Sequence, residues 1–349
     1  MQKPFIAITM GDAAGIGPEI TVKSLAEPEL RAWCEPIVLG DLGVLRDAAA
    51  AAGVDLRLTA IGAPSEWRPD GTSVAVIDSA DVDRSKLRMG VMDPALGAAA
   101  VGYTRQAARL ALADEVQGIV SAPLNKEAMR AAGFHYEGAT AIFAEEAGVK
   151  RHAMILILGS MRLMLLTNHM SLRDAIDHVT EEHVYEKIIL AHEALVAQGM
   201  AAPRIGVSAL NPHAGEGGLF GREEIDEIEP AIARARAEGV NAIGPVPPDT
   251  VFFKAKQGMF DLTLALYHDA GLGAVKLLGF GTVVTLLAGL PFIRTSTGHG
   301  TAFDIAGKGI ADHKNLLGAI QVAAELGARR LRTPATARPA AGPAAAEPR

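Results

Sequence analysis

Short apolar segments alternate along the chain with longer segments whose apolar residues recur at helical spacing. An apolar run of about four to eight residues, bounded by glycine, proline or polar residues, is typical of a buried strand. Strands are predicted at 5–10, 36–40, 73–78, 118–122, 153–158, 162–167, 204–209 and 261–267. Helices are predicted at 41–52, 94–114, 181–199, 222–238 and 314–331. This alternation predicts an α/β protein.

The first predicted strand runs directly into the segment GDAAGIGPE, in which Pro18 suits a first helical turn and Glu19 complements a helix N-terminus. The segment is similar to a phosphate-binding loop, but its spacing fits neither GxGxxG nor the Walker motif, and it lacks the Walker lysine. We interpret it as a tight strand-to-helix turn, with Asp12 as a candidate lining residue of a nearby site.

The stretch from Ala265 to Gly309 combines apolar segments with a histidine beside an aspartate, a lone lysine, an arginine and the run HGTAFDIAGKG. Its glycines leave the backbone free to lie close against a ligand. Asp304 can accept hydrogen bonds from a ribose diol, and the ring of His299 can stack on a base or bond to it. An ordinary glycine-punctuated turn explains the same composition equally well.

Composition restricts the class of protein. The chain has 349 residues, enough for two domains, and its 49% hydrophobic and 21% charged content is that of a soluble globular protein. The net charge of −7 disfavours nucleic acid as a partner. Cys34 is the only cysteine, so a reducing cytoplasm is the expected setting. No signal peptide is expected, because the N-terminus runs from QKP into FIAITM without a basic region and a longer apolar core. No membrane span is expected, because Gly159, Ser160 and Arg162 interrupt the most apolar stretch.

Three histidines each follow a predicted apolar strand: His169, His213 and His268. Strand ends collect at one edge of a sheet, so residues far apart in the chain can meet there. Neutral imidazoles with open positions left for a substrate suit a divalent metal. Histidines that are merely hydrogen-bonded within the structure remain the alternative.

Several motifs together resemble a known family. HGTAFDIAGKGIAD resembles the adenosine-binding loop of the isopropylmalate and isocitrate dehydrogenase superfamily, which holds NAD without a Rossmann motif. The fuller pattern resembles one branch, the 4-hydroxythreonine-4-phosphate dehydrogenases, and runs from about Phe5 to Leu331. The motifs are ITMGDAAGIGPE, SAPLNKEAM, NHMSLRD, LNPHAGEGG, GPVPPDT, YHDAG and GLPFIRTS.

The resemblance implies a two-domain α/β/α sandwich of the isopropylmalate dehydrogenase-like type, with the active site in the interdomain cleft. It suggests one domain of 1–125 with 262–332, which bears the NAD loop, and a central domain of 126–261 with dimer contacts. The tail, 333–349, is expected to be disordered because it is rich in proline and alanine. One metal ligand in the family comes from the partner subunit, which implies a homodimer with shared active sites.

The family reaction oxidises a hydroxyl beta to a carboxylate, passes hydride to NAD, and releases carbon dioxide. The resemblance implies a divalent metal (Zn, Mg, Co or Mn) on His169, His213 and His268. It implies NAD on His299, Gly300, Thr301 and Asp304, and Asp304 favours NAD because it would repel a 2′-phosphate. Lys276 and Arg294 would supply positive charge to the substrate. Lys126, Asp249 or a water on the metal could move protons, and these alternatives stay open.

Two substrate-binding motifs depart from the family. Where the family has Gly-His-Thr-Glu and uses the histidine and threonine on the substrate phosphate, this chain has Gly138, Ala139, Thr140 and Ala141. Only the Thr140 hydroxyl remains, because alanine cannot donate a hydrogen bond. The substrate-binding asparagine of the family aligns with Thr285. Either other groups hold the phosphate, or the substrate has none.

The substrate therefore has three candidates. The default is 4-phosphohydroxy-L-threonine, converted to 3-amino-2-oxopropyl phosphate in the vitamin B6 pathway. The alternatives are a four-carbon sugar-acid phosphate and an unphosphorylated cis-dihydrodiol carboxylate of terephthalate-type catabolism. A non-catalytic binding protein would have lost a metal ligand or the glycine-rich loop, and neither loss is seen. A true isopropylmalate dehydrogenase builds its metal site from aspartates, which three histidine motifs disfavour.

Overall fold

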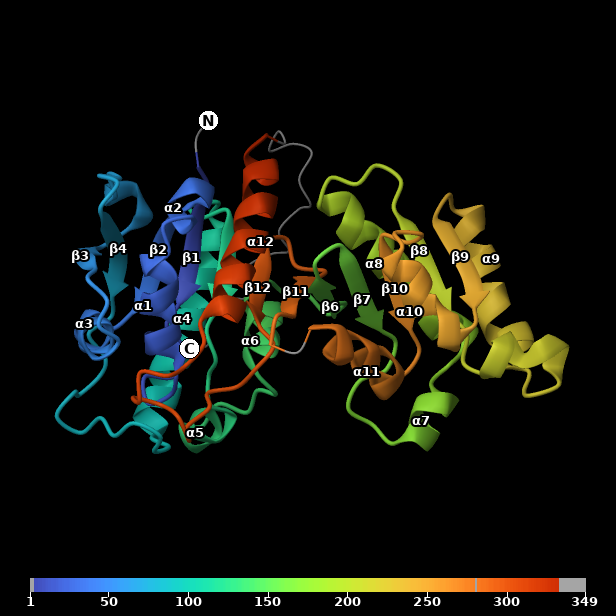
Figure 1. The fold of residues 1–349 in the computed structure, drawn as a ribbon, viewed down its shortest axis with the longest axis horizontal. Coiled ribbons are helices and arrows are strands. Elements are labelled where there is room, and N and C mark those ends of the chain that lie inside the picture. The colour runs from blue at the N-terminus through green and yellow to red at the C-terminus, as the bar shows by residue number, and fades with distance from the viewer. Residues whose placement is uncertain (1–2, 280, 333–349) are drawn as a thin grey trace. The chain divides into compact units, whose positions relative to one another are not determined.

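The computed structural model describes residues 3–279 and 281–332, which form two compact units. Unit 1 contains the described residues up to Lys150 and those from Leu290 onward, and unit 2 is Arg151–Gly289. In the colours of Figure 1, unit 1 contains the segments from blue to green at the start of the chain and the last orange and red segments, and unit 2 contains the segments between them in sequence. The structure is mixed α/β, as the apolar pattern predicts.

Unit 1 is built on six parallel strands in the order β3-β4-β2-β1-β5-β12. The strands are β1 (Phe5–Thr9), β2 (Glu35–Gly40), β3 (Arg57–Ile61), β4 (Ser73–Asp78), β5 (Gly118–Ser121) and β12 (Arg294–Thr297). The helices are α1 (Gly17–Ala26), α2 (Leu30–Trp33), α3 (Leu42–Ala51), α4 (Pro94–Leu112), α5 (Lys126–Ala131), α6 (Ala139–Glu146) and α12 (Lys314–Arg332).

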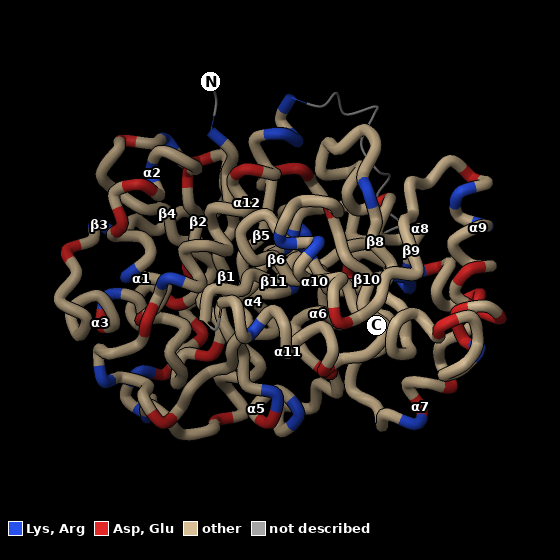
Figure 2. Tube along the Cα trace, turned by 45° about the vertical axis from the view of Figure 1, so that its right-hand side comes forward, with Lys and Arg blue, Asp and Glu red and all other residues tan. Residues whose placement is uncertain are grey.

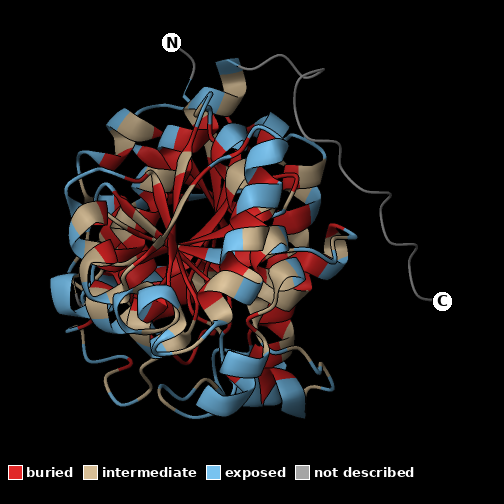
Figure 3. Cartoon of the chain, turned by 90° about the vertical axis from the view of Figure 1, so that its right-hand side faces the viewer, coloured by how far each residue is buried: buried red, intermediate tan, exposed pale blue. Residues whose placement is uncertain are grey.

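The central strands of unit 1 are buried along almost their whole length. Figure 3 shows buried residues in red, and red predominates on the strands of the chain. Successive side chains of a strand point to opposite faces, so such a strand must be covered on both sides. The helix α4 packs on β1, β2 and β5, and α12 packs on β1, β5 and β12. Side-chain caps fix where helices begin: Asp41 accepts from Val44 N at α3, and Asn125 accepts from Ala128 N at α5.

Unit 2 has six strands in the order β11-β6-β7-β10-β8-β9, of which β6 is antiparallel to both of its neighbours and the others pair in parallel. The strands are β6 (Ala153–Leu158), β7 (Met161–Leu165), β8 (Arg204–Ser208), β9 (Asn241–Val246), β10 (Leu262–Ala265) and β11 (Val284–Ala288). The helices are α7 (Leu172–Asp177), α8 (Glu181–Ala197), α9 (Glu229–Ala237), α10 (Pro248–Lys256) and α11 (His268–Gly279).

The boundaries between the units differ from the domain boundaries suggested by the sequence. The suggested central domain was 126–261, whereas unit 2 is Arg151–Gly289. The helices α5 and α6 belong to unit 1 because they pack on α4, where Met129 and Ile142 join Val101 in one buried cluster. The helix α11 belongs to unit 2 because it packs on β7 and β10. The segment 333–349, predicted to be a disordered tail, lies outside the described residues.

Over 3–279 and 281–332, no helix combines the length and the apolar character needed to cross a membrane.

Candidate functional site

In unit 1, three neighbouring parallel strands end at the same edge of the sheet. Ser121 of β5 lies in register with Thr9 of β1 on one side and with Ser296 of β12 on the other. The segments that follow these strands carry most of the polar residues selected from the sequence of this unit. Ligands of open α/β sheets gather at such carboxyl ends.

The glycine-rich segment after β12 is held by α1 and the turn before it. Thr301 O accepts a hydrogen bond from Ile16 N at 3.0 Å, and a Cβ at Gly15 would lie 3.0 Å from Thr301 Cβ. Lys23 donates to Gly309 O at 2.9 Å and to Ala311 O at 3.0 Å. His299, Gly300 and Asp304, predicted to bind NAD, lie exposed on this clamped segment, and Thr301 is half-buried.

Asp12 lies in the turn beneath this segment and is 1% exposed. Its Oδ1 accepts from Ala14 N at 2.9 Å, while its Oδ2 has no hydrogen-bond partner in the described part of the chain. Burial, with a smaller contribution from the charge of Asp93, raises the pKa of the Asp12 carboxyl. An ionised Asp12 is therefore unfavourable in the folded protein, because burial removes water from its carboxylate.

Replacing Asp12 with asparagine is expected to keep the bond to Ala14 N and remove this charge. A carboxyl whose pKa is raised in the folded state destabilises the fold only when ionised, so its penalty is absent below about pH 4 and grows as the pH rises toward the raised pKa. Urea unfolding should show Asp12→Asn gaining stability over the wild type between pH 4 and pH 8. Asp55→Asn, an exposed carboxyl, serves as the control. A difference that shrinks with rising pH would contradict the assignment.

Arg294 is the most unusual charge in unit 1. It lies on β12, is 4% exposed, and donates from Nε to Ser121 Oγ at 3.3 Å. Its guanidinium lies 5.2 Å from the ring centre of Phe143, on α6, and no carboxylate pairs with it within the described residues. Burial lowers the pKa of Arg294 to about 10. A buried cation without a counter-ion is costly unless an anionic ligand completes it.

Two other residues selected from the sequence, Thr140 for substrate binding and Lys126 for proton transfer, belong to unit 1. Thr140 precedes Phe143 by three residues, so both occupy the same face of α6. Lys126 begins α5, and its Cε would lie 3.6 Å from a Cβ at Gly138, which precedes α6. Arg294 lies against α6 through Phe143, Thr140 shares that face of α6, and Lys126 lies beside Gly138. We call these three residues the Arg294 cluster and take them as candidates for holding an anion.

In unit 2, the three predicted metal histidines follow the adjacent parallel strands β7, β10 and β8. The rings of His169 and His268 lie 5.5 Å apart between centroids. His268 Nδ1 lies 2.7 Å from Asp269 Oδ1, and His213 Nδ1 lies 2.7 Å from Glu216 Oε1. A carboxylate only accepts, so Nδ1 must carry the proton, and a neutral ring then presents its Nε2 lone pair. We call these three residues the histidine edge.

The histidine edge fits a divalent metal in donor chemistry and in its carboxylate partners. The structure brings His169 and His268 together but not all three rings: within the described residues, no three His, Cys, Asp or Glu side chains are grouped closely enough to hold a metal ion. The Glu216 carboxylate, with a smaller effect of Asp249, raises the pKa of His213. The contact of His213 Nδ1 with Glu216 Oε1 is the cause of this shift.

His213 lies in an unusual turn, Pro212–Gly218. His213, Ala214 and Glu216 have φ values of 53°, 60° and 43°, and the glycines at 215 and 217 are also left-handed. A left-handed conformation costs a non-glycine residue roughly 1–2 kcal/mol, so the surrounding structure must enforce it. Strain of this kind clusters at functional sites.

The remaining predicted residues of unit 2 are spread over three elements. Asp249 is exposed in the first turn of α10, close enough to His213 for its charge to act on that imidazole. Lys276 is exposed on α11 and makes no ion pair within the described residues. Thr285 is buried on β11, opposite Leu156 of β6.

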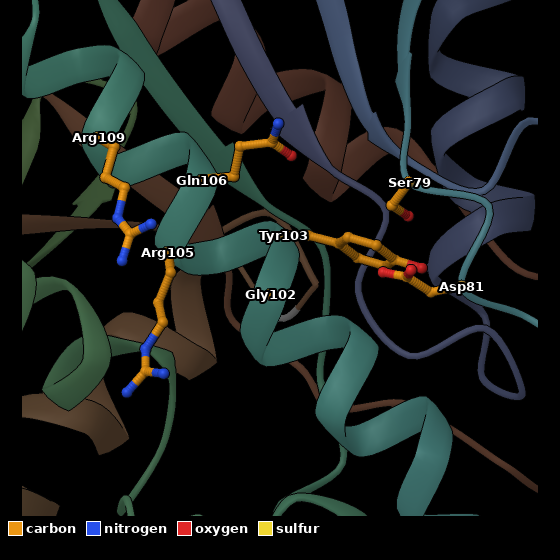
Figure 4. Close-up of a pocket in the computed structure, with 7 residues that line it drawn as sticks. All are labelled: Ser79, Asp81, Gly102, Tyr103, Arg105, Gln106 and Arg109. Atoms are coloured by element: carbon orange, nitrogen blue, oxygen red, sulfur yellow. The ribbon is translucent and has the colours of Figure 1, made fainter. Parts of the chain in front are cut away.

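A shallow pocket on α4 has a different character. Figure 4 shows Tyr103, Ser79 and Asp81 on one side of it, with Arg105 and Arg109 turned away from them. Both arginines pair with Glu146, at 3.2 and 3.3 Å. No residue selected from the sequence lines this pocket, and its arginines are already neutralised.

Together, the fold and the two sheet edges define an α/β protein with a histidine edge in one unit and a clamped glycine-rich segment beside a buried arginine in the other. The family model described as pyridoxal phosphate biosynthetic protein PdxA matches residues 32–323, so the chain belongs to this family. The resemblance found from the sequence motifs is therefore confirmed.

Three proteins similar to this chain have names that state different substrates. The chain is 46% identical to a D-threonate 4-phosphate dehydrogenase of Cupriavidus necator, over 94% of this chain and 98% of the relative. A 4-hydroxythreonine-4-phosphate dehydrogenase structure from Klebsiella pneumoniae has a TM-score of 0.87 and 42% identity, over 93% and 99% of the two chains. A terephthalate 1,2-cis-dihydrodiol dehydrogenase structure from Burkholderia xenovorans has a TM-score of 0.65 and 32% identity, over 92% and 98%.

Proposed function

We propose that this protein is a dehydrogenase that uses NAD and a divalent metal to oxidise the 3-hydroxyl of a phosphorylated four-carbon acid, which then loses carbon dioxide. The observation that carries this proposal is Arg294, a buried guanidinium without a carboxylate partner in the described chain. Arginine matches phosphate and carboxylate with two parallel hydrogen bonds, so such an acid would complete it. The names of the relatives at 42–46% identity support a phosphorylated substrate.

Within this proposal, the side chains have distinct roles. Arg294 and the Thr140 hydroxyl hold the anionic end of the substrate, and Lys276 and Thr285 contact other parts of it. The histidine edge presents Nε2 atoms to a divalent cation, which when bound would polarise the hydroxyl and the ketone, while NAD would accept the hydride. Asp249, which is exposed and acts on His213 through its charge, would take the hydroxyl proton, with Lys126 or a water on the metal as the alternatives.

The glycine-rich segment supports NAD over NADP. Asp304 is exposed there and would accept from the ribose hydroxyls, whereas its charge would repel a 2′-phosphate. Asp304→Asn is expected to lower the preference for NAD by roughly tenfold to a hundredfold, because like charges in contact cost several kcal/mol. Initial rates with each cofactor measure the ratio. Asp312→Asn, another exposed carboxyl of the same segment, should leave it unchanged. An unchanged ratio in Asp304→Asn would remove Asp304 from the ribose site.

Two phosphorylated acids deserve direct comparison. 4-Phosphohydroxy-L-threonine would give 3-amino-2-oxopropyl phosphate, and D-threonate 4-phosphate would give the corresponding hydroxy ketone phosphate. One carries an ammonium group at carbon 2 and the other a hydroxyl. The comparison of NADH formation from the two acids, with Mg²⁺, Mn²⁺, Co²⁺ or Zn²⁺, tests the proposal and assigns the substrate. Absence of turnover with both acids would reject it.

A second candidate is oxidation of an unphosphorylated cis-dihydrodiol carboxylate. The observation that favours it is Ala139 at the start of α6, where no side-chain donor is available for a phosphate. A dihydroxycyclohexadiene dicarboxylate in the same assay provides the test. If this compound is turned over and neither phosphate ester is, Arg294 binds a carboxylate.

We also propose that the active species is a homodimer. In unit 2, Leu277 of α11 is 87% exposed and Met154 of β6 is also exposed, which would suit an apolar contact between copies. Sedimentation equilibrium measures the assembly, and a monomer at assay concentration would reject this proposal.

A further inference from the structure

A buried carboxylate, that of Glu224, accepts hydrogen bonds from the residues just before the strained turn that carries His213. Glu224 is 1% exposed and begins the π-helical turn Glu224–Ile228. Its Oε1 accepts from Leu210 N at 2.8 Å and from Asn211 N at 2.7 Å, and its Oε2 accepts from Asn211 Nδ2 at 2.9 Å. The same carboxylate therefore fixes the backbone and the side chain of the residues that lead into the turn.

Glu224 also touches the turn itself. A Cβ added at Gly215 would lie 2.8 Å from Glu224 Oε2, and Gly215 has φ of +76°. Glycine is thus required there both for its conformation and for the approach of the carboxylate. Glu224 thus contacts the left-handed turn at Asn211, which precedes it, and at Gly215 within it. These contacts help to hold the strained backbone of the turn.

Glu224 differs from its acidic neighbours. Figure 2 shows acidic residues gathered in this part of unit 2, near α9, and the others at 223–229 are half-buried or exposed. No lysine or arginine in the described chain pairs with Glu224, so its charge is balanced by N–H donors alone. Burying a carboxylate is costly unless it is hydrogen-bonded. All three donors to Glu224 lie on the loop that leads to His213, so their hydrogen bonds fix that loop.

We propose that Glu224 is a positioning residue that holds the left-handed turn and thereby sets how tightly the histidine edge binds a divalent cation. The inference rests on the proposed function, in which His213 is a metal ligand. It assigns no chemistry to Glu224, which acts only through the backbone of the His213 turn.

The test uses Glu224→Gln in the full chain. A glutamine oxygen can still accept from both backbone amides, but its NH₂ group then faces Asn211 Nδ2, and a flipped amide loses the backbone bonds instead. Co²⁺ titration, followed by visible absorption, measures the metal affinity without substrate or cofactor. Glu224→Gln is expected to weaken Co²⁺ binding by roughly tenfold to a hundredfold, the range found for residues that orient metal ligands.

The matched control is Glu223→Gln. Glu223 is half-buried and accepts only from Asn211 Nδ2, at 2.6 Å, so its loss leaves both backbone bonds in place. The Co²⁺ affinity of Glu223→Gln should stay within about twofold of that of the wild type, since contacts of exposed or partly exposed charged groups contribute little. Deuterium exchange of peptides covering 209–220 should be faster in Glu224→Gln and unchanged in Glu223→Gln.

Two further variants keep the outcomes separable. Gly215→Ala forces a methyl group against the Glu224 carboxylate, so it should also weaken Co²⁺ binding, and it replaces Glu224→Gln if that variant melts below the assay temperature. If His213→Ala weakens Co²⁺ binding but Glu224→Gln and Gly215→Ala bind Co²⁺ like the wild type, the positioning role of Glu224 is rejected and the metal assignment stands. If His213→Ala binds Co²⁺ like the wild type, the metal assignment fails and the inference falls with it, a result visible without any change at Glu224.

Discussion

Replacing Arg294 with methionine is expected to make the protein more stable and nearly inactive. The buried guanidinium has a pKa lowered to about 10, which means that folding holds a charge where it is poorly solvated. An apolar side chain of similar length removes this penalty, and we expect a gain of about 1–3 kcal/mol in the free energy of unfolding. kcat/KM should fall roughly a thousandfold, because losing one partner of a buried charged contact costs about 2–5 kcal/mol.

Chemical unfolding and steady-state kinetics measure the two effects on the same preparation. Arg204→Met is the matched control, since Arg204 is paired with Asp261 at 2.9 Å and should lose stability without losing activity. The opposite signs separate a binding role from a structural one. A stability loss in Arg294→Met with unchanged kcat/KM would show that Arg294 serves the fold.

Replacing His213 with alanine is expected to abolish turnover while leaving the protein folded. The side chain is exposed and its ring contacts Glu216, so its removal should change the free energy of unfolding by no more than about 0.5 kcal/mol. A bound metal stabilises developing charge by several kcal/mol, so the loss of one ligand should reduce kcat by roughly a thousandfold or more.

A second histidine of the same unit provides the comparison. His183, in the first turn of α8, stacks on His178, which follows α7, at 3.8 Å between ring centroids. His183→Ala should keep full activity. Near wild-type turnover by His213→Ala would remove the metal hypothesis, whatever the affinity of the protein for Co²⁺.

The periodic pattern was sufficient for the elements whose apolar character is strong. All eight predicted strands correspond to observed strands, and β1, β5 and β8 end within one or two residues of the prediction. The helix α11 was missed because its sequence, HDAGLGAVKLLG, is rich in glycine and adjoins an apolar strand. The domain boundaries suggested at 125/126 and 261/262 differ from the division into compact units for another reason: the packing that adds α5 and α6 to unit 1 and α11 to unit 2 has no local signal in the sequence.

The site was predictable only in part. That three histidines follow strands could be read from the chain, but the order β7-β10-β8, which makes those strands neighbours, depends on long-range pairing. Asp269 could have been suspected from its position beside His268. Glu224 could not, because it lies on a separate turn, in an acidic run that looks like a solvated surface, and only tertiary structure buries it.

The chain enters and leaves unit 2 through two strands that lie side by side, since Ala153 of β6 pairs with Ala288 of β11. The three histidines of the histidine edge thus lie in one uninterrupted stretch of the chain, whereas the Arg294 cluster and the glycine-rich segment lie outside it. Under the proposed function, exchange of residues 151–289 between relatives is expected to carry the three histidines together and to leave the residues proposed to bind NAD with the recipient.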